Sequence, residues 1–535
     1  MAEPAAFPET EPKALPTTAE RTAHLFTFDE FLRFWADDRP NGIALDGPDR
    51  TLTYLQLEQT TAQAVAGLQA LGLVKGDRIA WFGKNCSLYF TLFFAAARLG
   101  AVMVPIGWRL APAEATWIAG DAQAKAVFLG AGFEAFADAF AALPTVGPCL
   151  TQDDAWAWID TQGRGAFQAA GPDDAVLQLY TSGTTGNPKG AVLSNLNLFG
   201  LRKQSIGNDQ PYAAMTDDEA ILVAMPCAHI GGTGLGVMAI GAGLPGIILS
   251  EFEPRAVFDA VEQKGVTRFF IVPAALQMLL NHPDCAGVDF SRLKYIIYGA
   301  SPIPLVLLRE CIAMFRAEFI QAYGMTETTG TICILPPEDH CVEGNQRMRS
   351  AGKPLPGVEV RVVDEHGKAL GVGEIGEIQT RSSNNMLGYW NLPEATAKTM
   401  TAGGWIATGD AGYFDEDGYV YMHDRIKDMI ITGGENVYPA QVESAIYGHP
   451  DVLEVAVIGV PDETWGEAVK AVCVPKAGHM IDPQSVIEWT RQRLAAFKVP
   501  KSVDVIDALP RNPSGKILRR TLREPYWAGL ERQVN

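Results

Sequence analysis

The stretch from Leu179 to Asn195, "LYTSGTTGNPKGAVLSN", is the part of the chain from which its fold and chemistry are first inferred. Between Leu179 and Gly190 it holds three glycines, four serine or threonine hydroxyls and one lysine. Glycines let backbone N–H groups approach phosphate oxygens, while hydroxyls and a lysine add hydrogen bonds and charge. The order differs from a Walker loop, which needs a glycine, four residues and then Gly-Lys-Ser/Thr. We expect a phosphate-binding loop here, with an ordinary flexible Gly/Thr loop as the competing interpretation.

The segments around this loop alternate short apolar runs with helical patterns. Strands are expected at 175–180, 220–226, 268–273, 294–300 and 318–323, and helices at 253–265 and 304–315. Continuous apolar strands joined by helices predict an α/β fold with mostly parallel sheets covered by helices. Ligands bind beyond the carboxyl ends of such strands, so the loops that follow them are expected to meet in one cleft.

The pattern of predicted strands and helices changes near residue 425. Two alternating strands are expected at 452–462 and 467–475, followed by a helix from Asp482 and Pro483 to about Phe497. This pattern predicts a small α+β domain, with Asp482 and Pro483 as a helix N-cap and first-turn pair. We expect a loose arm over 1–25, a large domain over 26–424 and a small mobile domain over 425–535, with a hinge at 424–428.

Composition limits the classes of protein. A net charge of -19 and a pI of about 4.9 argue against a nucleic-acid partner and against docking on an anionic membrane. The apolar stretch 92–108 is interrupted by Arg98 and Pro105, and the N-terminus has no apolar signal segment. The eight cysteines form no Cys-x-x-Cys pair and are interpreted as reduced thiols. We expect a cytoplasmic protein without a membrane span.

Three further motifs can each carry chemistry. In "YGMTE" (323–327) the tyrosine can stack on a base, Thr326 offers a hydroxyl and Glu327 offers an oxygen ligand for Mg²⁺. Asp410 and Arg425 could hold a ribose. Lys516, in "PSGK", lies in a turn of the small domain and could reach the cleft. Taken singly, each has a plain alternative: a surface Thr-Glu, a turn aspartate and a solvating lysine.

Three further features of the sequence have competing interpretations. His229 follows an expected strand and is either a packed histidine or a substrate contact. Nine lysines and arginines between residues 491 and 523 form either a solvated face or a patch for a polyanion. The segment "GAGLPG" (241–246) matches a dinucleotide motif, but a proline lies inside it and an apolar run follows in place of a helix. We therefore discard a dehydrogenase.

Together the motifs resemble the adenylate-forming superfamily, which contains acyl-CoA synthetases, luciferases and peptide-synthetase adenylation domains. The phosphate loop, "YGMTE", "ATGD", "DRIKD", "GGENVYP" and "PSGK" occur in the order of that family. The resemblance implies that a carboxylate attacks the α-phosphorus of ATP to give an acyl-adenylate and pyrophosphate. The thiol of coenzyme A then displaces AMP, and the small domain rotates between the two steps.

The resemblance also assigns roles to residues. The nucleotide would be held by Thr181, Ser182, Gly183, Thr184, Thr185, Gly186, Lys189, Gly299, Ala300, Ser301, Tyr323, Gly324, Asp410 and Arg425. The catalytic residues would be Lys516, Thr326, Glu327 and His229, with Glu327 positioning Mg²⁺. The acyl pocket would be formed by His229, Gly232, Thr233, Gly324 and Met325, the hinge by Lys427, and the coenzyme A tunnel by Gly433 and Gly434.

The sequence predicts the carboxylic acid substrate less specifically than it predicts the reaction. "HIGGTG" (229–234) and "GYWNLPEATAKT" (388–399) are most similar to fatty-acid and related CoA ligases. Fatty-acid members often place a tryptophan four residues after the histidine, where this chain has Thr233, so we expect a roomy apolar pocket. A medium- or long-chain fatty acid is favoured. Aryl, aryl-alkyl or steroid-side-chain acids, transfer to a carrier protein and a homodimeric state are kept as alternatives.

Overall fold

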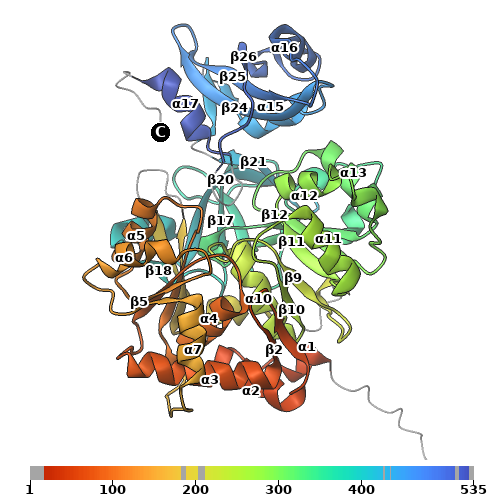
Figure 1. The fold of residues 1–535 in the computed structure, drawn as a ribbon. Helices are drawn as coiled ribbons and strands as arrows, with labels where there is room; N and C mark the ends of the chain where they lie inside the picture. The colour runs from red at the N-terminus through yellow and green to blue at the C-terminus, as the bar shows by residue number, and fades with distance from the viewer. Residues whose placement is uncertain are drawn as a thin grey trace, which may run out of the picture.

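A computed structural model describes residues 17–181, 188–202, 211–425, 428–433, 435–511 and 517–528. Two mainly parallel sheets form the large part of the molecule (Figure 1). The predicted α/β fold with a large N-terminal and a smaller C-terminal domain is confirmed. The strands expected from the apolar runs are all present, although they divide between the two sheets.

The first sheet has the strand order β18-β8-β7-β4-β3-β5-β6. Its strands are β3 (Arg78–Phe82), β4 (Val102–Ile106), β5 (Ala124–Leu129), β6 (Cys149–Thr151), β7 (Ala175–Thr181), β8 (Lys189–Ser194) and β18 (Gly388–Tyr389). Strands β3 to β7 run parallel, while β8 and β18 run antiparallel at one edge. The loop first predicted to bind phosphate therefore leaves β7 at this edge of the sheet.

The second sheet has the order β15-β14-β13-β12-β11-β9-β10-β1-β2. Its strands are β1 (Ile43–Asp46), β2 (Thr51–Thr53), β9 (Ile221–Val223), β10 (Gly246–Ile248), β11 (Arg268–Ile271), β12 (Tyr295–Gly299), β13 (Glu318–Tyr323), β14 (Cys333–Leu335) and β15 (Lys353–Pro354). The run from β13 to β1 is parallel. Strand β10 begins at the last glycine of "GAGLPG" (241–246), so no helix follows the segment, which agrees with the rejection of a dinucleotide site.

A third sheet was not predicted from the sequence. It is antiparallel and consists of β16 (Glu359–Val363), β17 (Gly376–Arg381), β19 (Met400–Thr401), β20 (Trp405–Phe414) and β21 (Val420–Arg425). The connections from β19 to β20 and from β20 to β21 are short and contain glycine, a residue that accepts the positive φ of tight turns, as at Gly418 (φ 81°). This sheet leads into the C-terminal domain.

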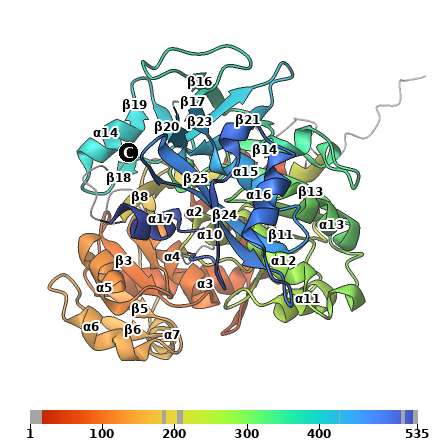
Figure 2. The same cartoon turned by 90° about the horizontal axis from the view of Figure 1, so that it is seen from above.

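The smaller domain contains a mixed sheet of β22 (Ile430–Thr432), β23 (Glu435–Val437), β24 (Val452–Asp462), β25 (Gly466–Pro475) and β26 (Ser502–Val505). Helices α15 (Pro439–Ile446), α16 (Pro483–Arg491) and α17 (Arg519–Trp527) complete it. It lies over the end of the large domain near β20 and β21 (Figures 1 and 2). The Tyr447 hydroxyl donates a 3.0 Å hydrogen bond to Gln277 Oε1 of α12 (Pro273–Leu280), linking the two domains.

Helices cover both faces of the two parallel sheets. They are α1 (Thr18–Arg21), α2 (Phe28–Asp38), α3 (Tyr54–Ala70), α4 (Ser87–Leu99), α5 (Pro112–Asp121), α6 (Ala137–Ala141), α7 (Gln152–Asp160), α8 (Asn195–Phe199), α10 (Ile230–Ala242), α11 (Pro254–Gln263), α12 (Pro273–Leu280), α13 (Leu305–Phe315) and α14 (Pro393–Thr399). Helix α10 lies between the sheets, packed in one apolar core with α2, α3 and α4. Helices α11, α12 and α13 cover the other face of the second sheet.

Two expectations about chain segments need correction. The loose arm was expected to reach residue 25, but Thr17 caps α1 and Leu25 is only 7% exposed, because it joins the main apolar core. The helix expected to end near Phe497 begins as predicted at Asp482 and Pro483 but ends at Arg491. Ala495 there takes an extended ψ of 148°, which turns the chain toward β26.

Two expectations drawn from composition can be compared with the structure. All eight cysteines lie within the described ranges and are free thiols, and six of them are buried. Across the ranges that the structure describes, no helix is both long enough and apolar enough to cross a membrane.

Candidate active site

The base of the predicted phosphate loop is a β-hairpin. Strands β7 and β8 are antiparallel, and Thr181 pairs with Lys189 across the hairpin. A Walker loop runs from a strand into a helix, whereas this loop returns directly as a second strand. The predicted residues Ser182, Gly183, Thr184, Thr185 and Gly186 lie outside the described ranges. The hairpin fixes the positions of the threonine and the lysine on either side of them.

Glu327 lies at the meeting point of the two parallel sheets. It belongs to a 3₁₀ turn, Thr326–Thr328, that follows β13, and it is only 5% exposed. Thr181, at the end of β7, donates a 3.3 Å hydrogen bond from Oγ1 to Glu327 Oε1. Tyr389 of β18 donates a 2.7 Å hydrogen bond from its hydroxyl to the same oxygen. The structure thereby joins two predicted site residues that are far apart in the sequence.

Tyr389 is a site residue that the sequence reasoning did not identify. Besides binding Glu327, its ring lies 5.2 Å from Nζ of Lys189, within the range of a cation–π contact. Burial and the neighbouring Glu327 carboxylate raise the pKa of the Tyr389 hydroxyl, so it remains a hydrogen-bond donor. The only sequence feature that marks Tyr389 is its position in "GYWNLPEATAKT" (388–399), a motif that supports only the family resemblance.

Tyr323 and Asp410 form a second contact between segments of the site. The Tyr323 hydroxyl, at the end of β13, donates a 2.8 Å hydrogen bond to Asp410 Oδ2 on β20. Burial and this carboxylate raise the pKa of Tyr323. Arg425 is the register partner of Asp410 in the β20–β21 pair, which brings the backbones of the two predicted ribose contacts side by side. Only the backbone of Arg425 is described.

The predicted adenine segment has an unusual backbone. Gly299 ends β12, and Ala300 follows with a φ of 66°, in the left-handed region that L side chains seldom adopt. Ser301 is exposed. A Cβ atom on Gly324 would lie 1.7 Å from the carbonyl oxygen of Gly330, so only glycine fits where the chain folds back. These segments form the end of the second sheet closest to Glu327 and Asp410.

The residues expected to form the acyl pocket face different parts of the structure. His229 is the N-cap of α10 and is partly exposed, as is Met325 on the other segment. Thr233 is fully buried: its hydroxyl lies 2.6 Å from the Tyr89 hydroxyl of α4 and donates to the Cys227 carbonyl at 2.6 Å. A Cβ on Gly232 would lie 2.2 Å from the Pro226 carbonyl oxygen. Gly232 and Thr233 thus face the β9–α10 connection and α4, and their place in an acyl pocket stays a prediction.

The small domain holds the remaining predicted residues. Gly433 has a φ of 59° and its N–H donates a 2.8 Å hydrogen bond to the Trp465 carbonyl. Lys427, Gly434 and Lys516 lie outside the described ranges. The segment containing Lys516 is closed at its base by an antiparallel bridge between Arg511 and Ile517.

The basic run near the C-terminus is partly neutralised within the domain. Ion pairs join Arg511 to Glu454, Arg519 to Glu443, Arg520 to Glu524 and Arg523 to Asp428. These four of its nine cations are therefore matched by carboxylates of the chain itself. The pairing favours the solvated-face interpretation over a patch for a polyanion.

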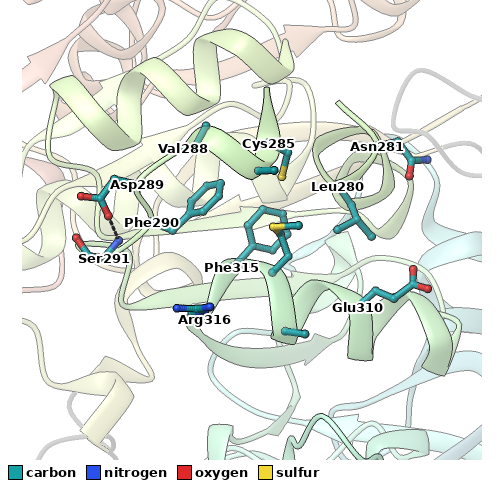
Figure 3. Close-up of a pocket in the computed structure, with 13 residues that line it drawn as sticks. Leu280, Asn281, Cys285, Val288, Asp289, Phe290, Ser291, Glu310, Phe315 and Arg316 are labelled. Carbon is teal, nitrogen blue, oxygen red and sulfur yellow. Dashed lines mark hydrogen bonds between the residues drawn. The ribbon is translucent and has the colours of Figure 1, made fainter. Parts of the chain in front are cut away.

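A separate pocket of about 810 Å³ lies between α12 and α13 (Figure 3). Leu280, Phe290 and Phe315 supply apolar walls, and Asn281 and Glu310 lie at its edge. It belongs to the layer that covers the outer face of the second sheet. Among the described residues, no member of the predicted site lines it, so it is distinct from the cluster around Glu327.

The residues around Glu327 fit a magnesium ion. Mg²⁺ prefers oxygen ligands and is commonly held by one or two carboxylates together with substrate phosphates and water. Glu327 supplies a carboxylate, and both hydroxyl donors use its Oε1. Magnesium bound beside this group would neutralise phosphate charge, and Glu327 would be its protein ligand.

Comparison with known proteins identifies the family of the chain. The model of the family described as AMP-binding enzyme matches residues 32–390, and that of the AMP-binding enzyme C-terminal domain matches residues 441–516. The chain therefore belongs to the AMP-binding enzyme family. Its relatives are acyl-CoA and acyl-carrier-protein ligases, so the predicted membership of the adenylate-forming superfamily is confirmed.

Three relatives illustrate the range of the family. The fatty acid–[acyl-carrier-protein] ligase ScoC of Streptomyces coeruleorubidus is 40% identical over 94% of this chain and 97% of its own. A feruloyl-CoA synthase of Amycolatopsis sp. is 38% identical over 91% of this chain and 96% of its own. The solved structure of ATP-bound MatB from Rhodopseudomonas palustris has a TM-score of 0.85, at 32% identity, and covers 94% of this chain and 99% of that one.

Proposed function

We propose that this protein activates a hydrophobic carboxylic acid with ATP and transfers the acyl group to coenzyme A, releasing AMP and pyrophosphate. A medium- or long-chain fatty acid is the proposed substrate, and the cytoplasm the proposed location. The carboxylate oxygen attacks the α-phosphorus, and the bond to pyrophosphate breaks. The thiol sulfur then attacks the acyl carbon, its proton leaves to solvent or a base, and AMP departs.

The observation that supports this proposal most is the group around Glu327. One buried carboxylate accepts hydrogen bonds from Thr181 at the end of β7 and from Tyr389 on the edge strand β18, beside Lys189. Attack of one anion on another needs charge neutralisation and alignment more than covalent help from the protein. These needs would be met by three groups at the base of a glycine-rich loop: a carboxylate that can bind Mg²⁺, a hydroxyl and a lysine.

The other predicted residues complete the proposal. Asp410 and Arg425 would bind the ribose, and Tyr323 with the segment 299–301 would enclose the adenine. Lys516 would bridge the carboxylate and the α-phosphate while the small domain is docked for adenylation. Rotation about a hinge at 424–428, with Lys427 in it, would withdraw this lysine and bring Gly433 and Gly434 toward the thiol. We propose the boundary between the two domains at this same hinge.

A carrier protein is a second candidate acceptor. The relative ScoC is named as a fatty acid–[acyl-carrier-protein] ligase, and it is similar over nearly the whole chain. The phosphopantetheine thiol of a carrier protein would attack the acyl-adenylate just as the thiol of coenzyme A would. The feruloyl-CoA synthase supports an aryl acid as the alternative substrate with coenzyme A as the acceptor.

The test is a reconstitution with separate acids and acceptors. The protein is incubated with ATP, Mg²⁺ and straight-chain, aryl or steroid-side-chain acids, with either coenzyme A or a phosphopantetheinylated carrier protein. Acyl-CoA and AMP formed from one straight-chain acid far faster than from the others would support the proposal. AMP with acyl transfer only to the carrier protein would replace the acceptor, and no AMP with any acid would contradict the proposal.

A further inference from the structure

Trp390 lies directly after Tyr389 and is bound on two sides by other segments of the chain. Its backbone N–H donates a 2.8 Å hydrogen bond to the carbonyl oxygen of Gly190, the residue that follows Lys189. Its indole Nε1–H donates at 2.9 Å to the carbonyl oxygen of Asp121, the last residue of α5. Because the last carbonyls of a helix lack partners within the helix, the indole supplies one of them with a donor.

The guanidinium of Arg78, at the start of β3, covers the face of this indole ring. Its Cζ atom lies 3.3 Å from the ring centre of Trp390, well within the range of a cation–π contact. The side chain is half-buried, and burial lowers the pKa of Arg78. Nε donates to Gln178 Oε1 at 3.3 Å, and Nη1 donates to the Gly76 carbonyl at 2.5 Å. A guanidinium is planar and stacks on aromatic faces, so one that is fixed in this way holds the ring in one orientation.

Gln178 links this stacked pair to the β7–β8 hairpin. It is fully buried on β7, and its Nε2 donates at 3.1 Å to the Tyr180 hydroxyl. That hydroxyl donates at 2.5 Å to Oδ2 of Asp121, the residue whose carbonyl binds the indole of Trp390. A Cβ atom on Gly190 would lie 2.7 Å from Gln178 Nε2, so a glycine lets β8 pack closely on the amide. The network therefore closes on itself through α5 and both strands of the hairpin.

The residues that this network holds are immediate neighbours of the candidate site. Strand β18 is only two residues long, below the usual length of a strand, so its pairing with β8 gives Tyr389 little support. With Trp390 fixed beside it, the Tyr389 hydroxyl donates at 2.7 Å to Glu327 Oε1, and its ring lies 5.2 Å from Lys189 Nζ. The orientation of Tyr389 thus depends on the side chain that follows it.

We infer that Trp390 is a positioning residue that holds the Tyr389 hydroxyl against Glu327. Arg78 fixes its ring and Asp121 fixes its indole N–H, so Trp390 acts on the site through Tyr389. A carboxylate that is already oriented loses little freedom when its ligand binds. The inference rests on the proposed function, in which Glu327 binds Mg²⁺ beside the phosphates of ATP.

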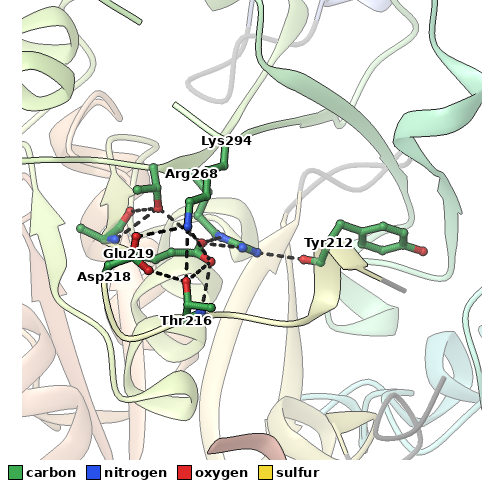
Figure 4. A network of polar contacts seen from close by, with 8 residues as sticks. Tyr212, Thr216, Asp218, Glu219, Arg268 and Lys294 are labelled. Atoms are coloured by element: carbon green, nitrogen blue, oxygen red, sulfur yellow. Dashed lines mark hydrogen bonds and ion pairs between the residues drawn. The ribbon is translucent and has the colours of Figure 1, made fainter. Parts of the chain in front are cut away.

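A second buried guanidinium serves as the structural comparison (Figure 4). Arg268 donates from Nη2 to Glu219 Oε2 at 2.6 Å and from Nη1 to the Tyr212 carbonyl at 3.0 Å, and both charged side chains are 2% exposed. Arg268 begins β11 and Glu219 lies just before β9, so this pair is at the amino ends of two parallel strands. Ligands bind at the carboxyl ends of such strands. A change in this pair should therefore affect stability and not the site.

The experiment is a double-mutant cycle between Trp390→Leu and Tyr389→Phe. It is followed by kcat for ATP–pyrophosphate exchange with the best of the tested acids, and by the calorimetric Kd of Mg²⁺-α,β-methylene-ATP, an analogue that resists cleavage. In the wild type, Trp390→Leu should lower kcat and raise Kd roughly tenfold each, the order expected when one hydrogen bond to a charged group is lost. In Tyr389→Phe it should change either value by less than about twofold, because the hydroxyl that it positions is already absent. Trp390→Phe keeps a ring for Arg78 and should recover part of both values.

Glu219→Gln is the control and should lower the melting temperature while kcat and Kd stay unchanged. Equal effects of Trp390→Leu in the two backgrounds would overturn the inference, and so would a Trp390→Leu protein in which only the melting temperature falls. If Trp390→Leu does not fold, the same cycle is run with Trp390→Phe, and additive effects there again overturn the inference. A wild type that binds the analogue but exchanges with no acid would contradict the proposed function, and the cycle in Kd would still decide the inference.

Discussion

The Tyr323 hydroxyl, at the end of β13, donates a 2.8 Å hydrogen bond to Oδ2 of Asp410 on β20. The bond joins the second parallel sheet to the antiparallel third sheet, and it fixes the orientation of a carboxylate proposed to bind ribose. A carboxylate held by a hydroxyl donor loses little conformational freedom when its ligand arrives. This pair is therefore where we expect nucleotide affinity to be most sensitive to a small change.

Tyr323→Phe should raise the KM for ATP by roughly tenfold, because a hydrogen bond to a charged group contributes about 1.5–3 kcal/mol. The measurement is the ATP dependence of pyrophosphate release at saturating acid. Tyr419→Phe is the matched control: its hydroxyl donates at 2.6 Å to Asp339, away from the proposed nucleotide site. The control should lose stability with an unchanged KM, and equal effects of the two variants would argue against a nucleotide role for Tyr323.

Glu327→Gln should lower the adenylation rate by roughly 10²-fold or more, in line with the loss of one preorganised charged contact in the transition state. Tyr389→Phe, which keeps the carboxylate and removes its 2.7 Å donor, should cost less. ATP–pyrophosphate exchange measures both. Exposed Glu338→Gln serves as the control. A Glu327→Gln protein that exchanges at the wild-type rate would remove this carboxylate from the proposed chemistry.

Lys516→Ala should reduce adenylation by roughly 10²–10³-fold, as expected when one transition-state charge contact is lost. It should spare thioester formation from a supplied acyl-adenylate, because the proposed rotation withdraws the lysine before that step. Each half-reaction is measured on its own. Lys476→Ala, an exposed lysine of the same domain, should leave both rates unchanged. Equal loss in the two half-reactions would refute the proposed role of Lys516.

Glu219→Gln should lower the free energy of unfolding by about 3–5 kcal/mol, because it leaves the buried Arg268 guanidinium without its counter-charge. Urea unfolding measures the change. Asp259→Asn breaks the more exposed pair with Arg255 and should cost under about 1 kcal/mol. Replacing Glu219 and Arg268 together by Leu and Met should restore part of the loss. Additive losses in the double variant would speak against the pair as the cause.

We expect the free energy of unfolding to decrease in mild acid because of His340. Burial lowers the pKa of this histidine from 6.5 to about 4, although Asp339 and the Pro336 carbonyl favour its charged form. Between these two values the unfolded chain binds a proton that the folded chain does not. The free energy of unfolding therefore decreases as the pH falls from about 6.5 to 4, by up to about 3 kcal/mol.

The check is urea unfolding at several pH values in this window for the wild type and His340→Gln. Carboxylates titrate in both proteins, so the difference between the two profiles isolates the histidine. The variant should show the flatter profile. Parallel profiles would mean that His340, which is bonded to the Tyr298 hydroxyl at 3.0 Å, already carries its proton in the folded state.

Local features of the fold could be predicted well from the sequence. Apolar runs and turn residues depend on neighbours along the chain, so β7, β11, β12, β13, β24 and β25 were found close to their observed bounds. The end of α16 differs from the prediction, because the chain has to reach the parallel pairing of β26 with β25, which is a long-range contact. The antiparallel third sheet is not predicted for a different reason: its partly exposed strands, such as β16 and β20, do not alternate regularly between buried and exposed residues.

The sequence by itself determined the family, the order of its motifs and the residue types available for phosphate, ribose and magnesium, because these are properties of short segments. Only the tertiary structure decided which side chains meet. Tyr389 approaches Glu327 from a position 62 residues further along the chain, and Thr233 turns toward Tyr89, 144 residues earlier. Trp390, directly after β18, meets Arg78 of β3, because both strands belong to one sheet. Contacts of this kind depend on how whole sheets close around a helix, and no local pattern encodes that closure.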